Sequence, residues 1–144
     1  MTYPKIGSVS EGTLRAEDLV DTFASELSYH IKRMRLTRAQ RKGFSELLRD
    51  ACGDQNEKYE IVDKLQDALS EIAPPYSYFG ASEGDGACFG FWPIINDELA
   101  RVAAGDAIPR EHWGEDVLII NDHGNCECGY VDKRGKFHEY WSCV

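Results

Sequence analysis

The sequence predicts an α+β fold, with three N-terminal helices packed on a C-terminal antiparallel sheet of about five strands. Two observations favour this class. Apolar residues recur at three- and four-residue steps before Pro74-Pro75, and aromatic-rich runs with strand-like patterning follow these prolines. With 144 residues, the chain is expected to form a single domain, with a helical part over 1–73 and a β part over 74–144.

Three helices are expected before the two prolines. The first carries one apolar stripe over about 20 residues, and Thr13 is the expected N-cap. The second begins at Thr37, where Gln40 three residues later completes the pattern of a capping box, and Gly53 is expected to end it. The third is expected to start within 54–57 and to end before the prolines, because proline excludes the preceding residue from helical geometry.

The remaining elements are predicted to be strands, with one exception. Residues 76–81 and 87–92 flank Glu83-Gly84-Asp85-Gly86 and predict a β-hairpin. Gly80 and Gly90 lie inside these two strands, which indicates a bulge or a close approach of two backbones. The exception is a short helix expected over 96–104. Further strands are predicted over 117–121, 126–132 and 137–144, with turns at 122–125 and 133–135.

Composition excludes several classes of function. The chain carries 16 basic and 25 acidic side chains, a net charge of −9, which disfavours general DNA binding because phosphate contacts need positive charge. No apolar run approaches the length of a membrane span, and the N-terminus lacks the apolar segment of a secretory signal. Five cysteines at uneven spacing predict free thiols in a reducing cytoplasm rather than a disulfide framework.

Charge is unevenly distributed along the chain. Residues 1–73 carry 11 basic and 13 acidic side chains, whereas residues 74–144 carry 5 and 12. Against this trend, six cations crowd the junction of the first two helices, and no acid lies between Glu26 and Glu46. These cations are Lys32, Arg33, Arg35, Arg38, Arg41 and Lys42. They are interpreted either as a phosphate-binding or acid-binding patch, or as cations that complement a helix dipole on a solvated face.

Residues that could carry catalytic or metal chemistry are few. Cys126 and Cys128 share one face of a predicted strand and could bind a metal with His123, His138 or Cys143, but their spacing lacks the pattern of a zinc site, so no metal is expected. A cysteine nucleophile, Cys88 or Cys143 activated by His123 or His138, is disfavoured by the acidity of this half. No nucleotide-binding or hydrolase motif occurs. The chain is therefore expected to be neither an enzyme nor a cofactor protein.

Six aromatic residues lie within a 17-residue stretch of the predicted hairpin. They are Tyr76, Tyr78, Phe79, Phe89, Phe91 and Trp92. Because neighbours in a strand point to opposite faces, the six cannot share one face. Most of them are expected to be core residues, and the remainder are expected to form part of a recognition surface, where Tyr and Trp are enriched.

Two separated segments carry a resemblance to a known family. One runs from Ala73-Pro74-Pro75-Tyr76 through Glu83-Gly84-Asp85-Gly86 to Phe91-Trp92, and the other is Val117-Leu118-Ile119-Ile120-Asn121-Asp122-His123-Gly124-Asn125. With these, and with the terminal Trp141-Ser142 and Val144, the chain resembles a family of small bacteriophage and prophage proteins of uncharacterised function. The resemblance covers residues from about 60 to 144, implies a phage or mobile-element origin, and supplies no catalytic residues.

These observations predict a phage-encoded inhibitor of a bacterial defence system, of the anti-CRISPR or anti-restriction type, in the cytoplasm of the host. The expected mechanism is an acidic and aromatic surface that blocks the nucleic-acid site of a defence protein or ribonucleoprotein. The contact residues would be Glu83, Asp85, Glu115, Asp116, Asp122, Tyr78 and Trp92. The protein is expected to be a monomer or homodimer without direct contact to nucleic acid. The alternatives are a nucleic-acid or nucleotide binder that uses the six cations, and a phage accessory domain.

Overall fold

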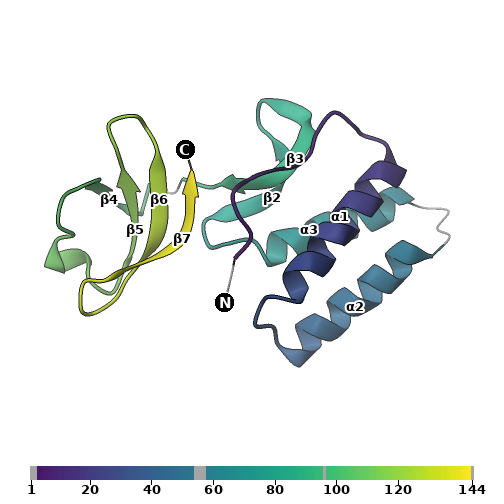
Figure 1. The fold of residues 1–144 in the computed structure, drawn as a ribbon, viewed down its shortest axis with the longest axis horizontal. Helices are drawn as coiled ribbons and strands as arrows, with labels where there is room; N and C mark the ends of the chain where they lie inside the picture. The colour runs from purple at the N-terminus through teal and green to yellow at the C-terminus, as the bar shows by residue number, and fades with distance from the viewer. Residues whose placement is uncertain (1–2, 54–57, 96, 144) are drawn as a thin grey trace. The chain divides into compact units, whose positions relative to one another are not determined.

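A computed structural model describes residues 3–53, 58–95 and 97–143. Three helices, seven strands and one short 3-10 helix occur in these ranges (Figure 1). In chain order they are β1 (Gly7–Ser10), α1 (Ala16–Ile31), α2 (Arg38–Cys52), α3 (Lys58–Glu71), β2 (Ser77–Ser82), β3 (Asp85–Pro93), β4 (Ala100–Ala103), η1 (Arg110–His112), β5 (Asp116–Ile120), β6 (Cys126–Val131) and β7 (Phe137–Cys143). The α+β class predicted from the sequence is confirmed.

The chain forms two compact units. The first comprises residues 1–73 and 77–92, and the second comprises residues 74–76 and 93–144. The first unit therefore contains the β2–β3 hairpin as well as the helices. Its bounds differ from those of the helical part, 1–73, and the β part, 74–144, that the sequence predicts within a single domain. The single sheet of about five strands is a wrong prediction, because the structure has a three-stranded sheet and a separate four-stranded sheet.

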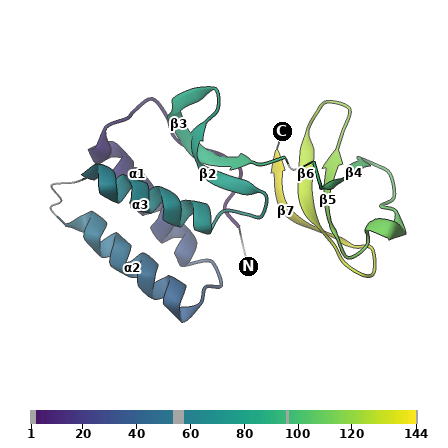
Figure 2. The same cartoon turned by 180° about the vertical axis from the view of Figure 1, so that it is seen from behind.

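The first unit is built around a pair of helices. α1 packs against α3, and α2 contacts both of them (Figure 2). The centre of the core is formed by Phe23, Leu27, Leu65 and Leu69, each with no measurable exposure. The apolar stripes predicted from the sequence are thus the faces that meet in this core.

The two helix starts that sequence patterns predicted turn out differently. At α2 the capping box is confirmed, because the Thr37 hydroxyl accepts from the Gln40 N–H at 3.1 Å and the Gln40 side chain accepts from the Thr37 N–H at 3.0 Å. At α1 the expected Thr13 cap is wrong, since the helix begins at Ala16 after Arg15, whose side chain caps nothing. Thr13 instead donates to the Asp18 carboxylate at 2.8 Å. The expected start of the third helix, within 54–57, lies outside the described residues.

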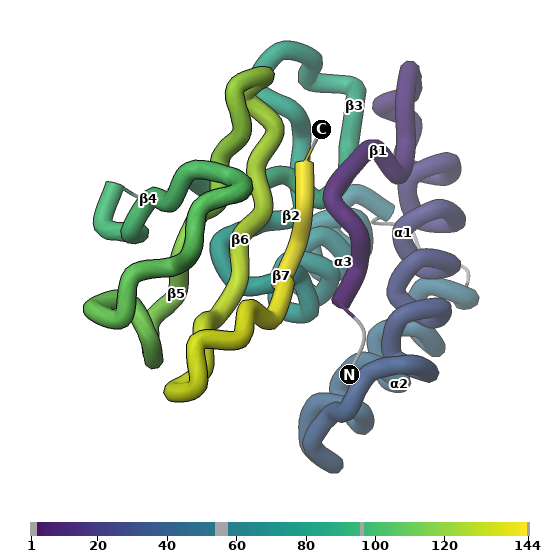
Figure 3. The backbone as a smooth tube through the Cα atoms, turned by 60° about the vertical axis from the view of Figure 1, so that its left-hand side comes forward, coloured from purple at the N-terminus to yellow at the C-terminus, as the bar shows by residue number. Residues whose placement is uncertain are grey.

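The sheet of the first unit has the strand order β1-β3-β2. Its edge strand β1 lies beside α1 (Figure 3) and was not predicted, because Gly7-Ser8-Val9-Ser10 is too short to show a strand period. Its pairing with β3 is interrupted by a bulge between Ser8 and Ser10. The predicted close approach at Gly90 is confirmed, since a Cβ at this position would lie 2.2 Å from the carbonyl oxygen of Gly7.

The second unit contains a four-stranded sheet in the order β4-β5-β6-β7. The helix expected over 96–104 is wrong for its described part, because 100–103 form β4, which pairs with β5 in parallel. The cause is tertiary, since Val102 is buried with Val117 and Val131 in a small core. The antiparallel pairing predicted for the last three strands is confirmed. The parallel pair was not expected.

Residues 74–76 belong to this second unit and contain an unusual backbone conformation. Tyr76 has a φ of 61°, the only positive φ of a non-glycine residue among the described positions. Such a conformation costs a non-glycine residue about 1–2 kcal/mol. The Tyr76 side chain holds the position through a hydrogen bond from its hydroxyl to Asp116 in β5.

Candidate functional site

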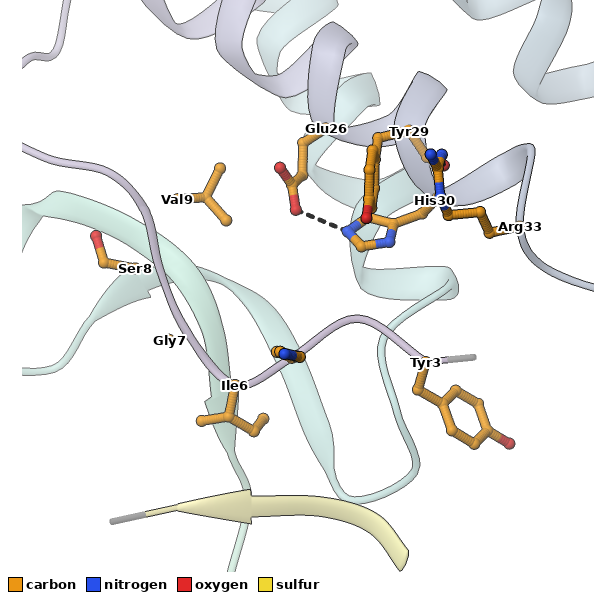
Figure 4. Close-up of a pocket in the computed structure, with 10 residues that line it drawn as sticks. Tyr3, Ile6, Gly7, Ser8, Val9, Glu26, Tyr29, His30 and Arg33 are labelled. Carbon is orange, nitrogen blue, oxygen red and sulfur yellow. Dashed lines mark hydrogen bonds and ion pairs between the residues drawn. The ribbon is translucent and has the colours of Figure 1, made fainter. Parts of the chain in front are cut away.

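The first unit contains a cavity of about 470 Å³ between α1 and the N-terminal segment (Figure 4). Its lining includes Lys5, Val9, three positions on one side of α1, and Arg33 just after this helix. Glu26, Tyr29 and His30 reach from the helix toward the segment that carries Ile6 and Val9. These side chains share a face because residues three and four apart in a helix lie one above the other.

A partly buried hydrogen bond lies on one wall of the cavity. His30 Nε2 is 2.7 Å from Glu26 Oε1, and only 10% of the His30 side chain is exposed. The imidazole ring meets Phe91 of β3 edge-on, with ring centroids 5.8 Å apart. The core therefore fixes the ring on one side, while the carboxylate of Glu26 fixes its orientation on the other.

Tyr29 and Arg33 form the mouth of the cavity. The Arg33 guanidinium lies 3.8 Å from the centroid of the Tyr29 ring and donates to the Tyr29 carbonyl oxygen at 2.8 Å. The guanidinium covers one face of the ring, and Tyr29 remains 52% exposed, so an aromatic side chain and a positive charge together form an exposed surface. This combination suits the stacking of a base next to a phosphate.

The basic corner, defined as Lys32, Arg33, Arg35, Arg38, Arg41 and Lys42, continues from this mouth to the start of α2. Two of its cations serve the fold. Arg33 binds the last turn of α1, and Arg41 donates to the carbonyl oxygens of Ile31 at 3.2 Å and Met34 at 3.4 Å. The C-terminal carbonyls of α1 are thereby satisfied in part by arginine.

The other four cations of the basic corner have no such structural role in the described part of the chain. Lys32, Arg35, Arg38 and Lys42 are exposed, and none forms an ion pair with a residue in the described ranges. The first turn of α2 has no acidic residue, so Arg38 stands at the positive end of a helix dipole. That placement is unfavourable for the isolated protein, and a bound anion would relieve it. Glu71 reaches this corner through a 3.5 Å contact with Gln40.

The acidic and aromatic residues predicted to bind a partner are distributed over both units. Glu83, Asp85, Tyr78 and Trp92 belong to the β2–β3 hairpin. Glu83 and Asp85 are exposed at its turn, and Asp85 accepts from the Ala87 N–H at 2.9 Å. Tyr78 and Trp92 are half-buried, and their polar atoms donate to the carbonyl oxygens of Ala81 and Gly80.

The remaining three acids lie in the second unit, where Asp116 has a structural role. It accepts from the Tyr76 hydroxyl at 2.5 Å and from the Tyr140 hydroxyl at 2.8 Å. The hydrogen bond between Tyr76 and Asp116 is the main cause that raises the pKa of Tyr76 from 10.0 to about 12, followed by burial and the charge of Asp116. Glu115 lies 3.3 Å from His112, and Asp122 is exposed in the β5–β6 turn.

The sulfur and imidazole groups weighed as metal ligands are not gathered into a site. Cys126 and Cys128 are buried in β6, whereas His123 is exposed in the preceding turn. Burial, with a smaller effect of the Asp116 charge, raises the pKa of Cys128 to about 12. Within the described part of the chain, no group of three or more metal-ligating side chains could hold an ion.

His30, Tyr29 and Lys5 are cavity residues that the sequence reasoning missed. His30 lies on the apolar stripe of the first helix, where the period predicts a core residue. The available signal was the four-residue spacing of Glu26 and His30, because this spacing brings their side chains together on a helix. The segment that closes the cavity could not be found in this way, since its contact with α1 is tertiary.

Comparisons with models of known protein families, with curated proteins and with solved structures each gave no match. Among the helices that the structure describes, none is long and apolar enough to cross a membrane.

Proposed function

We propose that the protein binds single-stranded nucleic acid through the first unit. The exposed cations of the basic corner contact backbone phosphates, and the cavity beside Tyr29 accepts one base. The observation that carries this proposal is the set of four exposed cations, unpaired within the described ranges, beside an exposed aromatic ring. Positive grooves with aromatic rings are the common means of binding single strands without sequence preference.

Electrostatics favours the basic corner over the chain as a whole. The net charge of −9 opposes a general affinity for polyanions, but at physiological salt exposed charges more than about 8 Å apart are largely screened. The electrostatic potential at a phosphate bound to the basic corner is therefore determined mainly by the local cations. The proposal departs in this respect from the expectation, based on net charge, that direct contact with nucleic acid is unfavourable.

The cavity supplies the second half of the proposal. Its volume of about 470 Å³ falls within the range of small-ligand pockets. A base that enters would meet the Tyr29 ring at the mouth and the Glu26–His30 pair on the wall, which offers polar atoms for its edge. Arg33 lines the cavity and also belongs to the basic corner, so one strand can use both.

The test is fluorescence anisotropy with a labelled single-stranded oligonucleotide over a salt series. Replacing Arg35, Arg38 and Lys42 by Gln should flatten the dependence of log K on log salt by about 2, since each phosphate contact contributes about 0.7 for single strands. The matched control replaces Lys133, Arg134 and Lys136, three exposed cations of the second unit, by Gln. Equal losses in both triple variants, or none in the first, would refute the proposal.

A separate variant tests the cavity. Tyr29→Ala should weaken binding by about tenfold through lost stacking, while the salt dependence stays that of the wild type. The Arg33 hydrogen bond to the backbone of residue 29 does not depend on the tyrosine ring. A changed salt slope with unchanged affinity at low salt would contradict the role given to the ring.

A second candidate function is that of a phage-encoded inhibitor of a host defence complex. The supporting observation is the β2–β3 hairpin, where Glu83 and Asp85 are exposed at the turn and the half-buried Tyr78 and Trp92 lie farther along the two strands. The acids would imitate phosphates in a nucleic-acid site of the partner. In an affinity capture from a defence-competent bacterium, Glu83→Lys with Asp85→Lys should release a stoichiometric defence complex, and Glu11→Lys with Asp63→Lys should retain it.

A further inference from the structure

The second unit contains two cysteines directly opposite each other on neighbouring strands. Cys126 of β6 and Cys143 of β7 are register partners in the antiparallel pairing. Opposite residues in such a ladder have Cα atoms about 4.5–5.5 Å apart, which falls in the range of about 4.4–6.8 Å found in disulfides. Both side chains point to the same face of the sheet, because they are paired across the ladder.

This pair is also accessible to a small reagent. Both cysteines line a cavity of about 310 Å³ at the end of the sheet. Cys126 is buried and Cys143 is half-buried, and both are free thiols in the structure. Burial raises the pKa of the Cys126 thiol, and the charge of Cys143 raises it further, as expected of neighbouring sulfurs.

The other cysteines are less suited to pair with either partner. Cys128 lies two residues along the same strand from Cys126, about 6.6 Å away, and faces Trp141 across the ladder. Cys88 and Cys52 belong to the first unit, where the Cys88 thiol donates to Ser8 and Cys52 is exposed on α2. Geometry therefore selects one pair among the five.

We propose that Cys126 and Cys143 form a reversible disulfide with each other. The oxidant is a low-molecular-weight disulfide, such as glutathione disulfide. The more exposed Cys143, as thiolate, attacks one sulfur of glutathione disulfide, and one glutathione thiolate leaves. Cys126, as thiolate, then attacks the Cys143 sulfur of the mixed disulfide and displaces the second glutathione. The two protons lost by the protein thiols are taken up by the two glutathione thiolates, so the protein is oxidised by two electrons and glutathione disulfide is reduced.

The consequence is a covalent link between the last strand and its neighbour. The link closes the chain from 126 to 143 around the β6–β7 turn, and it removes conformations of this segment from the unfolded chain. The second unit therefore becomes harder to unfold under oxidising conditions. The first unit, with the cavity and the basic corner, is unaffected in its own contacts.

The test uses the full chain, reduced and then equilibrated in buffers with a range of glutathione to glutathione disulfide ratios. Trypsin cleaves after Lys133, Arg134 and Lys136, so Cys126 and Cys143 fall in separate peptides. The expected product is one linked peptide pair that has lost two hydrogen atoms. It should appear in the wild type and in Cys88→Ser, and it should be absent in Cys143→Ser.

Two further measurements keep the result unambiguous. Fragmentation of the linked peptides distinguishes Cys126 from Cys128, and the same reaction in concentrated urea shows whether the native sheet directs the pairing. The proposal requires linkage through Cys126 that is faster in the folded protein than in urea. Linkage through Cys128, equal rates in urea, or persistent mixed disulfides with glutathione at Cys143 would each overturn it.

Discussion

The two polar clusters of this protein differ in how far their side chains are committed to the fold. In the second unit, Asp116 accepts hydrogen bonds from Tyr76 and Tyr140. In the basic corner of the first unit, Arg33 and Arg41 bind backbone carbonyls, whereas Lys32, Arg35, Arg38 and Lys42 have no ion-pair partner in the described ranges. The cluster around Asp116 stabilises the fold, whereas the basic corner contains hydrogen-bond donors that the fold does not use.

This difference shows why charge in a sequence is a weak guide to binding. Asp116 and Arg38 are both charged residues near the start of an element, and nothing in their local sequence separates them. Only tertiary structure decides, because the tyrosines that bind Asp116 are 40 and 24 residues away from it. Mutations in the Asp116 cluster are therefore expected to lower stability and leave binding unchanged. Mutations of the exposed cations in the basic corner are expected to lower binding and to leave stability almost unchanged.

The largest effect is expected from Asp116→Ala. The change leaves two tyrosine hydroxyls of the second unit without their acceptor, and hydrogen bonds to charged groups contribute about 1.5–3 kcal/mol each. Because the cluster is only half-buried, we expect a loss of about 2 kcal/mol in the free energy of unfolding, measured by urea denaturation. Nucleic-acid binding should be unchanged. Asp122→Ala, an exposed acid in the same unit, is the control and should have little effect.

A smaller effect, with a distinctive pH dependence, is expected from Tyr76→Phe. The variant should lose about 1 kcal/mol of stability at neutral pH, since one hydrogen bond is removed. The pKa of Tyr76 is raised from 10.0 to about 12, so its contribution is complete below pH 10 and disappears as the pH rises from 10 to 12. Urea denaturation at pH 8 and pH 11 should show the difference between wild type and variant shrinking. A constant difference would contradict this assignment.

The acid side of the stability curve should depend on Asp132. Its carboxylate is held by a hydrogen bond from His138 at 2.9 Å and by the N–H groups of Lys136 and Arg134, which lowers its pKa from 3.8 to about 2. A lowered pKa stabilises the folded state above about pH 4, and this stabilisation is lost as the pH falls to 2. Asp132→Asn should therefore lower the urea midpoint at pH 6, and the two proteins should converge near pH 2.

The control for that comparison is Asp106→Asn, an exposed carboxyl of the same unit. Its urea midpoint should follow that of the wild type at every pH. A shift at pH 6 equal to that of Asp132→Asn would mean that general charge, rather than the hydrogen bonds of the turn, is responsible.

The smallest effect on stability is expected in the basic corner. Arg38→Ala combined with Lys42→Ala should change the free energy of unfolding by less than about 0.5 kcal/mol, because exposed side chains without partners contribute little. The same variant should lose affinity for a single-stranded oligonucleotide. Arg41→Ala is the informative contrast, because it removes the donor to the Ile31 and Met34 carbonyl oxygens and should destabilise the first unit. Equal stability losses in the two variants would remove the distinction between free and committed cations.

Local signals were sufficient to predict several elements of the fold. The capping box at Thr37 and the last three strands, β5, β6 and β7, follow from side-chain chemistry within a few residues, and the structure contains them. The edge strand β1 and the parallel strand β4 were not predicted, since each has only four residues and depends on a distant partner. The division into two sheets likewise depends on pairing that no local pattern records.

The candidate site could be predicted only in part. The six cations were visible as a cluster in the sequence, but the cavity beside them requires the N-terminal segment to lie along α1. His30 shows the limit most clearly, because its position on an apolar stripe is compatible with burial alone. Its hydrogen bond to Glu26 becomes informative only when the cavity is known.

The left-handed conformation of Tyr76 has a consequence for the order of folding. An isolated Pro-Pro-Tyr segment gains nothing from this conformation, because the stabilising contact to Asp116 spans 40 residues. Contacts of such long range require loop closure before they stabilise anything. We therefore expect the turn at Pro75-Tyr76 to become ordered only after β5 has formed, so that mutations in this turn would speed unfolding and leave the refolding rate almost unchanged.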